Sequence, residues 1–72
     1  MALLIHSFDN LKDLSNALEK IEKLRREGIN VQVSIATFGN KHELRLIFDI
    51  KHVRKVAGVF PQSAVILAGG AE

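Results

Sequence analysis

The sequence predicts an α+β domain in which strands and helices follow one another in the order β-α-β-β-α-β. Two observations carry this prediction: a hairpin between residues 29 and 50 whose register fits its turn, and an apolar stripe of helical spacing that precedes it. A chain of 72 residues makes one domain, so we assign residues 1–72 to a single unit. A chain of this size buries only about 60% of its unfolded surface, and domains this small often gain stability by pairing.

The hairpin is the strongest local signal. A two-residue turn at Gly39-Asn40 places residue 38 opposite residue 41, and every further pair follows from that register. The register brings four apolar pairs to one face: Ile35 with Leu44, Val33 with Leu46, Val31 with Phe48, and Ile29 with Ile50. The opposite face receives polar side chains, Gln32, Ser34, Glu43 and Arg45. A slip of one residue would exchange the two faces, so the agreement between turn and pattern favours the hairpin.

A second interpretation of the same segment stays open. An apolar series also fits a helical period, which would make residues 42–60 one long helix and the sheet parallel. Its members are Leu46, Ile50, Val53, Ala57 and Phe60. The density of β-branched residues favours the hairpin over this helix.

The flanking elements follow from shorter patterns. Residues 2–8 read as a first strand, and Asp9 or Asn10 can cap the helix that follows. That helix runs for about 18 residues with one apolar stripe and ends at Gly28. The stripe consists of Leu11, Leu14, Leu18, Ile21 and Leu24. Residues 51–60 predict a short second helix that Pro61 ends, residues 64–68 a last strand, and residues 68–72 a loose tail.

This order of elements is that of the ferredoxin-like fold, a four-stranded antiparallel sheet with two helices on one face. The polar side of the hairpin fits a sheet whose second face stays uncovered. The expected strand order is 4-1-3-2, which makes the second strand an edge. That edge could also pair with a copy of itself, which would make the chain a purely structural, self-associating domain.

Composition narrows the function classes. The chain has no cysteine, which excludes disulfides, thiolate metal sites and a cysteine nucleophile, and which suits a cytoplasmic protein. Its apolar runs fall well short of the roughly 18 residues of a membrane span, so we expect no membrane partner. A net charge of +2 is too small to indicate a polyanion partner by itself. No nucleophile-base set, phosphate loop or carboxylate pair suggests an enzyme or a cofactor.

The segment Leu24-Arg-Arg-Glu-Gly-Ile-Asn-Val, followed by a strand, a glycine turn and Lys-His-Glu-Leu-Arg-Leu-Ile-Phe-Asp, resembles an ACT domain. ACT domains are small βαββαβ regulatory modules that sense amino acids or related metabolites. The resemblance spans nearly the whole chain. One departure is the loop before the first helix, where the family's Pro-Gly-x-Leu is here Asp9-Asn10-Leu11.

The resemblance implies a ligand site where that loop meets the start of the second strand, often across a dimer interface. Carried over to this chain, the site residues are Asp9, Asn10, Leu11, Gly28, Ile29 and Asn30. Each also has a structural interpretation, since Asp9 or Asn10 can cap the first helix and Gly28 can end it. Asn30 can equally bond its own backbone at the strand entry.

Two further groups of residues are candidate sites. Lys51, His52, Arg54 and Lys55 form a cluster without acids inside it, which is a candidate anion or nucleic-acid patch. A solvated helix face explains the same cluster. His6 and His42 lie on strands expected to be neighbours and could approach each other, but no third ligand is placed beside them, so we expect no metal site.

The sequence therefore predicts a non-catalytic regulatory module that dimerises and binds a small metabolite, expected to be an amino acid. The alternative is a nucleic-acid or protein adaptor that uses the basic second helix and the open face of the sheet. The effect of salt on affinity distinguishes the two hypotheses, because phosphate-driven binding weakens steeply with ionic strength.

Overall fold

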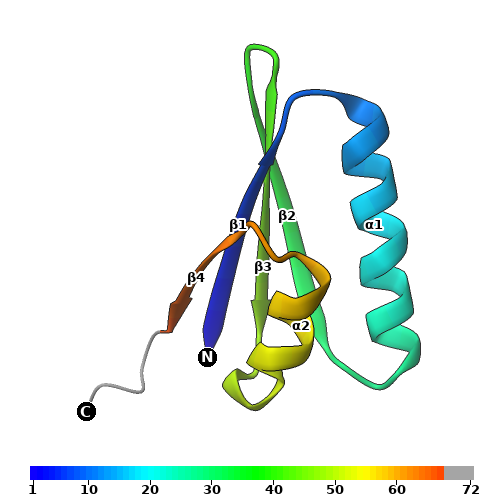
Figure 1. Ribbon diagram of the computed structural model, residues 1–72, viewed down its shortest axis with the longest axis vertical. Coiled ribbons are helices and arrows are strands. Elements are labelled where there is room, and N and C mark those ends of the chain that lie inside the picture. The colour runs from blue at the N-terminus through cyan, green and yellow to red at the C-terminus, as the bar shows by residue number, and fades with distance from the viewer. Residues whose placement is uncertain (68–72) are drawn as a thin grey trace.

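The computed structural model describes residues 1–67 of the chain (Figure 1). The elements are β1 (Ala2–Phe8), α1 (Leu11–Arg26), β2 (Val31–Phe38), β3 (Lys41–Phe48), the 3₁₀ turn η1 (Ile50–His52), α2 (Val53–Val59) and β4 (Ala64–Leu67). The predicted α+β class is confirmed. The single long helix over residues 42–60 is wrong, because residues 41–48 pair as a strand with two neighbours. The tail predicted for residues 68–72 lies outside the described residues.

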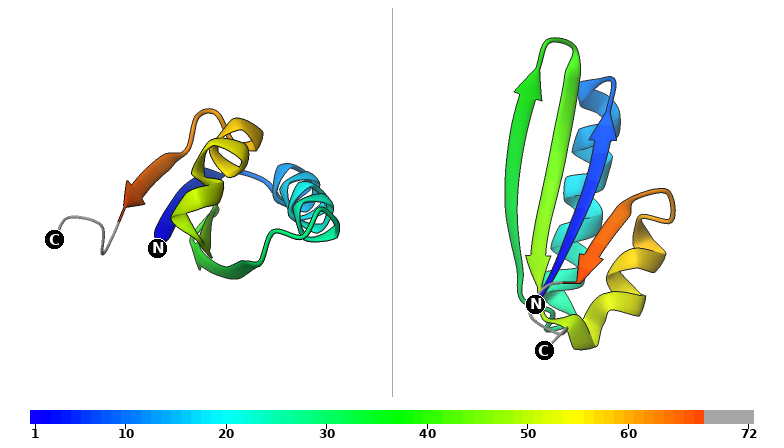
Figure 2. Two further views of the ribbon diagram at one scale, coloured as in Figure 1. Left: turned by 90° about the horizontal axis from the view of Figure 1, so that it is seen from below. Right: turned by 90° about the vertical axis from the view of Figure 1, so that its left-hand side faces the viewer.

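The four strands form one antiparallel sheet in the order β2-β3-β1-β4. Counted from the β4 edge, this order is 4-1-3-2. The right-hand view of Figure 2 shows both helices behind the sheet, so the face toward the viewer carries no helix. No helix within residues 1–67 has the length and apolar character needed to cross a lipid bilayer.

The β2–β3 hairpin has the predicted register over three of the four apolar pairs. Val31 faces Phe48, Val33 faces Leu46 and Ile35 faces Leu44. Gly39 has φ 62° and Asn40, the other residue of the turn, has no positive φ, which is the pattern of a type II′ turn. The fourth predicted pair, Ile29 with Ile50, is wrong, because β2 begins only at Val31 and β3 ends at Phe48.

The core lies between the inner face of the sheet and the two helices. The sheet contributes fully buried leucines at positions 4, 44 and 46. The helical side chains packed on them are Leu14, Ala17, Ile21 and Leu24 from α1, with Val56 and Phe60 from α2 and its end. The predicted stripe is wrong at Leu11, which is 66% exposed because it begins the helix ahead of the first buried turn.

The uncovered face of the sheet has two halves. Its β2–β3 half carries the predicted polar residues, and Arg45 Nε donates to Glu43 Oε1 at 2.8 Å. Its other half is apolar, because Leu3 on β1 lies between Ile47 of β3 and Ile66 of β4. The prediction of a polar open face is therefore right for the hairpin alone.

Of the Asp9-Asn10 pair, Asn10 is the residue that caps the start of α1. Its Oδ1 accepts a hydrogen bond from the Asp13 backbone N–H at 2.8 Å, and its Nδ2 donates to Asp13 Oδ2 at 3.1 Å. A cap of this kind satisfies an N–H group that has no partner inside the helix.

Asn10→Ala should therefore lower the free energy of unfolding by about 1 kcal/mol, because that N–H loses its partner. Asp9→Ala, next to it and without a capping bond, is the matched control and should change stability by no more than about 0.5 kcal/mol. Urea unfolding followed by circular dichroism compares the two, and a larger loss for Asp9→Ala would contradict the assignment of the cap.

Candidate functional site

The six residues implied by the family resemblance do not gather in one chain. Asp9, Asn10 and Leu11 lie at the start of α1, whereas residues 28–30 follow its end. A helix of 16 residues separates the two groups by about 24 Å. One chain therefore offers two half-sites at opposite ends of α1, and a small ligand can touch only one of them.

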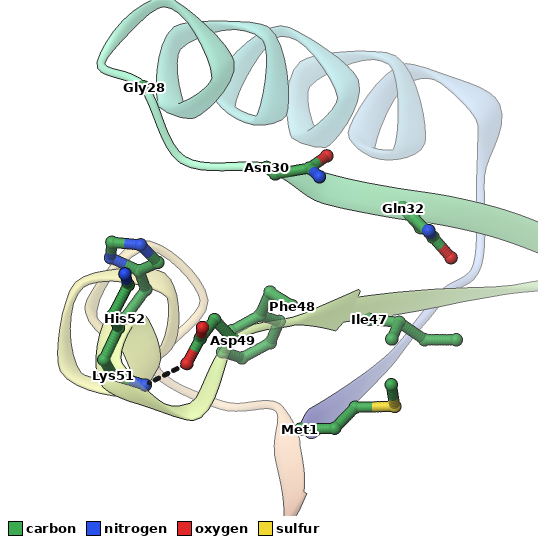
Figure 3. Close-up of a pocket in the computed structure, with 9 residues that line it drawn as sticks. All are labelled: Met1, Gly28, Asn30, Gln32, Ile47, Phe48, Asp49, Lys51 and His52. Atoms are coloured by element: carbon green, nitrogen blue, oxygen red, sulfur yellow. Dashed lines mark hydrogen bonds between the residues drawn. The ribbon is translucent and has the colours of Figure 1, made fainter.

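A hollow of about 490 Å³ lies at the end of the sheet where β2 begins and β3 ends (Figure 3). We call it the end pocket; its lining residues are Met1, Gly28, Asn30, Gln32, Ile47, Phe48, Asp49, Lys51 and His52. The pocket brings Gly28 and Asn30 together with Lys51 and His52, which the sequence had placed in two separate candidate sites. Ile29 is buried beneath it and does not line it.

The end of α1 holds the first wall of the end pocket in place. Gly28 has φ 91°, a left-handed conformation that glycine adopts readily. The N–H of Gly28 donates to the Arg25 carbonyl at 3.0 Å, and the N–H of Ile29 donates to the Leu24 carbonyl at 3.1 Å. This pair of bonds is a Schellman motif, and buried Ile29 anchors the chain just before Asn30 enters the pocket.

The side chain of Arg25 fixes the part of this wall that follows Asn30. Arg25 donates from Nη2 to the Val31 carbonyl at 2.9 Å and from Nε to the same oxygen at 3.3 Å. The bond joins the last turn of α1 to the first residue of β2. Asn30 is therefore held between two fixed points, which suits a residue that has to meet a ligand in one orientation.

Asp49 builds the opposite wall. Its Oδ1 accepts the Lys51 backbone N–H at 3.0 Å, and its carbonyl accepts the His52 N–H at 2.9 Å, so it caps η1. The hydrogen bond from the Lys51 backbone lowers the pKa of the Asp49 carboxyl, and the positive charges of Lys51, His52 and the chain's amino terminus act in the same direction. The Asp49 carboxyl is therefore held in its ionised form more firmly than an ordinary aspartate.

The end pocket combines both signs of charge with amides and an apolar patch. Figure 3 shows Asn30, just before β2, and Gln32 on β2 across the hollow from Asp49 and from Lys51 and His52 of η1. Ile47 and Met1 supply apolar surface at one side. A hollow with a few converging polar groups on an apolar base is the usual form of a small-molecule site.

The basic cluster of the second helix is less free than the sequence indicated. Lys55 forms an ion pair with Glu27 at the end of α1, and the hydrogen bond from Lys55 lowers the pKa of the Glu27 carboxyl. Lys51 and His52 line the end pocket, which leaves exposed Arg54 outside both arrangements. A phosphate backbone would therefore meet Lys51, His52 and Arg54, whereas Lys55 is already neutralised by Glu27.

The two histidines on neighbouring strands take other partners. His6 lies opposite Leu44 and His42 opposite Phe8. His6 packs its ring on Phe8 at 4.5 Å between centroids, and Nδ1 of His42 is hydrogen-bonded to the Thr37 hydroxyl at 3.2 Å. Within residues 1–67, no three histidine, aspartate or glutamate side chains are grouped to hold a metal ion.

The sequence reasoning missed Asp49, Gln32 and Ile47 as residues of the pocket. Asp49 carried a usable signal, since an aspartate just before a helix commonly caps it and so has a fixed position. The hairpin register already placed Gln32 beside Ile47 on the open face, which the structure confirms, but nothing in the sequence placed that pair beside the β3–η1 turn as part of a pocket. Comparison with protein-family models, curated proteins and solved structures gave no match for this chain.

Proposed function

We propose that this chain is a non-catalytic, cytoplasmic regulatory module that dimerises and binds a free amino acid in the end pocket. The observation that carries the proposal is the pairing, in one hollow of about 490 Å³, of an ionised carboxylate with cationic and amide groups. An amino acid offers an ammonium and a carboxylate a short distance apart. Asp49 would receive the ammonium, while Lys51 and Asn30 would bond the carboxylate.

The side chain of the ligand would lie over Ile47 and Met1, where the lining is apolar. This placement favours a small or medium aliphatic amino acid over a charged one. Burial of its apolar surface adds to the affinity, at about 25 cal/mol per Å² removed from water. The polar groups fix its orientation, and the apolar wall selects its size.

We also propose the ferredoxin-like assignment as the finer description of the fold. Its support is the β-α-β-β-α-β order together with the strand order 4-1-3-2 counted from β4. The ACT resemblance agrees with a ligand at Gly28 and Asn30, and it differs from this proposal at Asp9, Asn10 and Leu11. In one chain those three residues lie too far away to touch the same ligand.

The proposal is tested by a titration of isotope-labelled protein with a pool of the common amino acids, followed by amide NMR. No tryptophan or tyrosine is present as an optical probe. Saturable shifts are expected at Asn30, Gln32, Asp49 and Lys51. The absence of saturable shifts at millimolar concentrations of the pool would overturn the proposal.

Two alanine variants locate the site. Asn30→Ala should weaken binding about tenfold or more, because a hydrogen bond to a charged group contributes about 1.5–3 kcal/mol. Asp9→Ala is the control at the far end of α1, and its affinity should equal that of the unmodified protein. Equal weakening by both variants would instead show a site completed by a second chain, as the family resemblance implies.

A further inference from the structure

The open face of the sheet carries a continuous apolar surface over β1 and the adjoining parts of β3 and β4. We call it the face patch and define it as Met1, Leu3, Ile5, Ile47 and Ile66. Ile47 is 38% exposed and Ile66 is 50% exposed, although both sit on strands of the sheet. The right-hand view of Figure 2 looks onto this face, which no helix covers. A contiguous apolar surface of this kind marks an interaction site, whereas scattered exposed side chains do not.

We propose that the face patch is the dimer interface, with a second copy of this chain packed sheet against sheet across a two-fold axis. In this arrangement the two sheets lie about 10 Å apart and the helices of both copies face outward. The two-fold axis brings the same side chains together from both copies, so a patch that is apolar at its centre is complementary to its own copy.

The charges around the patch favour a second copy over a polyanion or an acidic membrane. The nearest cationic side chain on the strands of this face is Arg45, and the Glu43 carboxylate already neutralises it at 2.8 Å, so the positive charge of the patch itself is that of the amino terminus at Met1. A phosphate-rich partner would need free cations at that place. A surface bordered by the Glu43–Arg45 pair can instead meet its own copy, where opposite charges approach across the axis.

The size of the face is enough for a weak dimer and no more. Four strands about 4.8 Å apart span about 19 Å, and a seven-residue strand is about 23 Å long, which gives a footprint of roughly 440 Å² per copy. The two copies together bury somewhat less than the roughly 1,000 Å² that a specific interface usually needs. This figure treats the sheet as flat and leaves out the extra area of protruding side chains. The dimer should therefore use the whole open face and dissociate on dilution.

One competing surface for self-association is the free edge of β2, which is already occupied at its start. Arg25 donates two hydrogen bonds to the Val31 carbonyl at 2.9 and 3.3 Å, so an added strand would have to displace the guanidinium there. The face patch needs no such displacement. An edge partner pairs backbone groups, whereas the exposed isoleucines of the open face would remain in water.

The interface also borders the end pocket, because Met1 and Ile47 belong to both. A second copy on the face patch would close the open side of the pocket. Ligand binding and dimerisation would then strengthen each other by the same factor. This last step rests on the proposed function, whereas the dimer itself does not.

Sedimentation of the purified chain from about 1 µM to about 1 mM brackets weak association. A concentration-dependent dimer is expected. Ile66→Glu should weaken it at least about tenfold, because each interface then buries two unpaired carboxylates. The matched control is Ile35→Glu: Ile35 is 44% exposed, also lies on an edge strand, and faces the helix side of the sheet. It should leave the dimer intact.

Dilution of isotope-labelled protein, followed by amide NMR, maps the interface without any variant. Shifts that depend on concentration should be largest along β1 and the adjoining parts of β3 and β4, and smaller along β2. A monomer at about 1 mM would overturn the proposal. Shifts along β2, with dissociation by Ile35→Glu and none by Ile66→Glu, would overturn it in favour of the β2 edge.

The coupling is tested by adding the amino-acid pool to the same sedimentation samples, where a tighter dimer is expected. A pool that gives saturable NMR shifts without tightening the dimer overturns the coupling alone. A pool that gives no shifts overturns the proposed function, and the dimer is then judged by the Ile66→Glu and Ile35→Glu pair.

Discussion

Replacing Leu46 with alanine should lower the free energy of unfolding by about 2–5 kcal/mol, the usual cost of emptying a fully buried leucine site. Leu46 has 0% exposure and lies between Leu4 of β1 and Val33 of β2. Its side chain sits at the centre of the inner face. The surrounding strands are fixed by their ladders and cannot collapse fully into the space that alanine leaves.

The loss expected for Leu46→Ala is large relative to the total free energy of unfolding of so small a domain. A core in a domain of fewer than about 80 residues rarely supplies more than about 3–5 kcal/mol. Leu46→Ala should therefore be partly or fully unfolded at 25 °C, with loss of the helical signal in circular dichroism. Urea unfolding at a low, fixed protein concentration measures it, because association would add to the apparent stability.

The control for this variant is Ile35→Ala, on the same face of the sheet but 44% exposed near the hairpin turn. It should cost less than about 1 kcal/mol, since nearly half of its surface already meets water. Similar losses for both variants would mean that the inner face is not packed as described. A small loss for Leu46→Ala alone would have the same meaning.

The parts of the fold that sequence reasoning obtained are those fixed by local physical chemistry. The turn at Gly39-Asn40 determined the hairpin register, because a two-residue loop leaves only one alignment for the pairs that follow. Gly28 was correctly placed at the helix end for the same kind of reason, since its left-handed φ is costly for other residues.

The errors arose where two local patterns competed or where distant elements met. The pair of Ile29 with Ile50 was not formed, because the helix end holds Ile29 and the Asp49 cap starts η1 at Ile50. The open face was expected to be polar because only the hairpin's alternation was considered. Leu3 and Ile66 share that face only through pairing between β1 and β4, which the hairpin pattern does not contain.

The candidate site shows the same division. The residue types at 28–30 and 51–52 were identified from the sequence, but their union in one pocket depends on β2 and β3 being neighbours. Conversely, residues 9–11 were joined to 28–30 by resemblance, and the length of α1 separates them within one chain. The ion pair of Lys55 with Glu27 joins the ends of two helices, and no spacing in the sequence indicates it.

Two glycine substitutions should change stability in opposite directions. Gly28→Ala should cost about 1–3 kcal/mol, because φ at this position is 91° and a residue with a Cβ is strained there. No atom lies within 4 Å of the added Cβ, so the loss would be conformational and not a clash. Gly58→Ala lies in α2 with the same open space and without a positive φ, and it should gain about 0.4–1 kcal/mol.

The Gly28 variant also reports on function, because the same residue lines the end pocket and directs the chain toward Asn30. Any shift of the backbone that relieves the strain would move Asn30 away from its position between the Schellman motif and the Arg25 bond. Gly28→Ala should therefore weaken amino-acid binding as well as stability, while Gly58→Ala raises stability and leaves affinity unchanged. Urea unfolding and the NMR titration on the two variants measure both effects. A Gly28→Ala protein as stable as the unmodified chain would show that the helix does not end in a left-handed residue, and would remove the anchor on which the position of Asn30 depends.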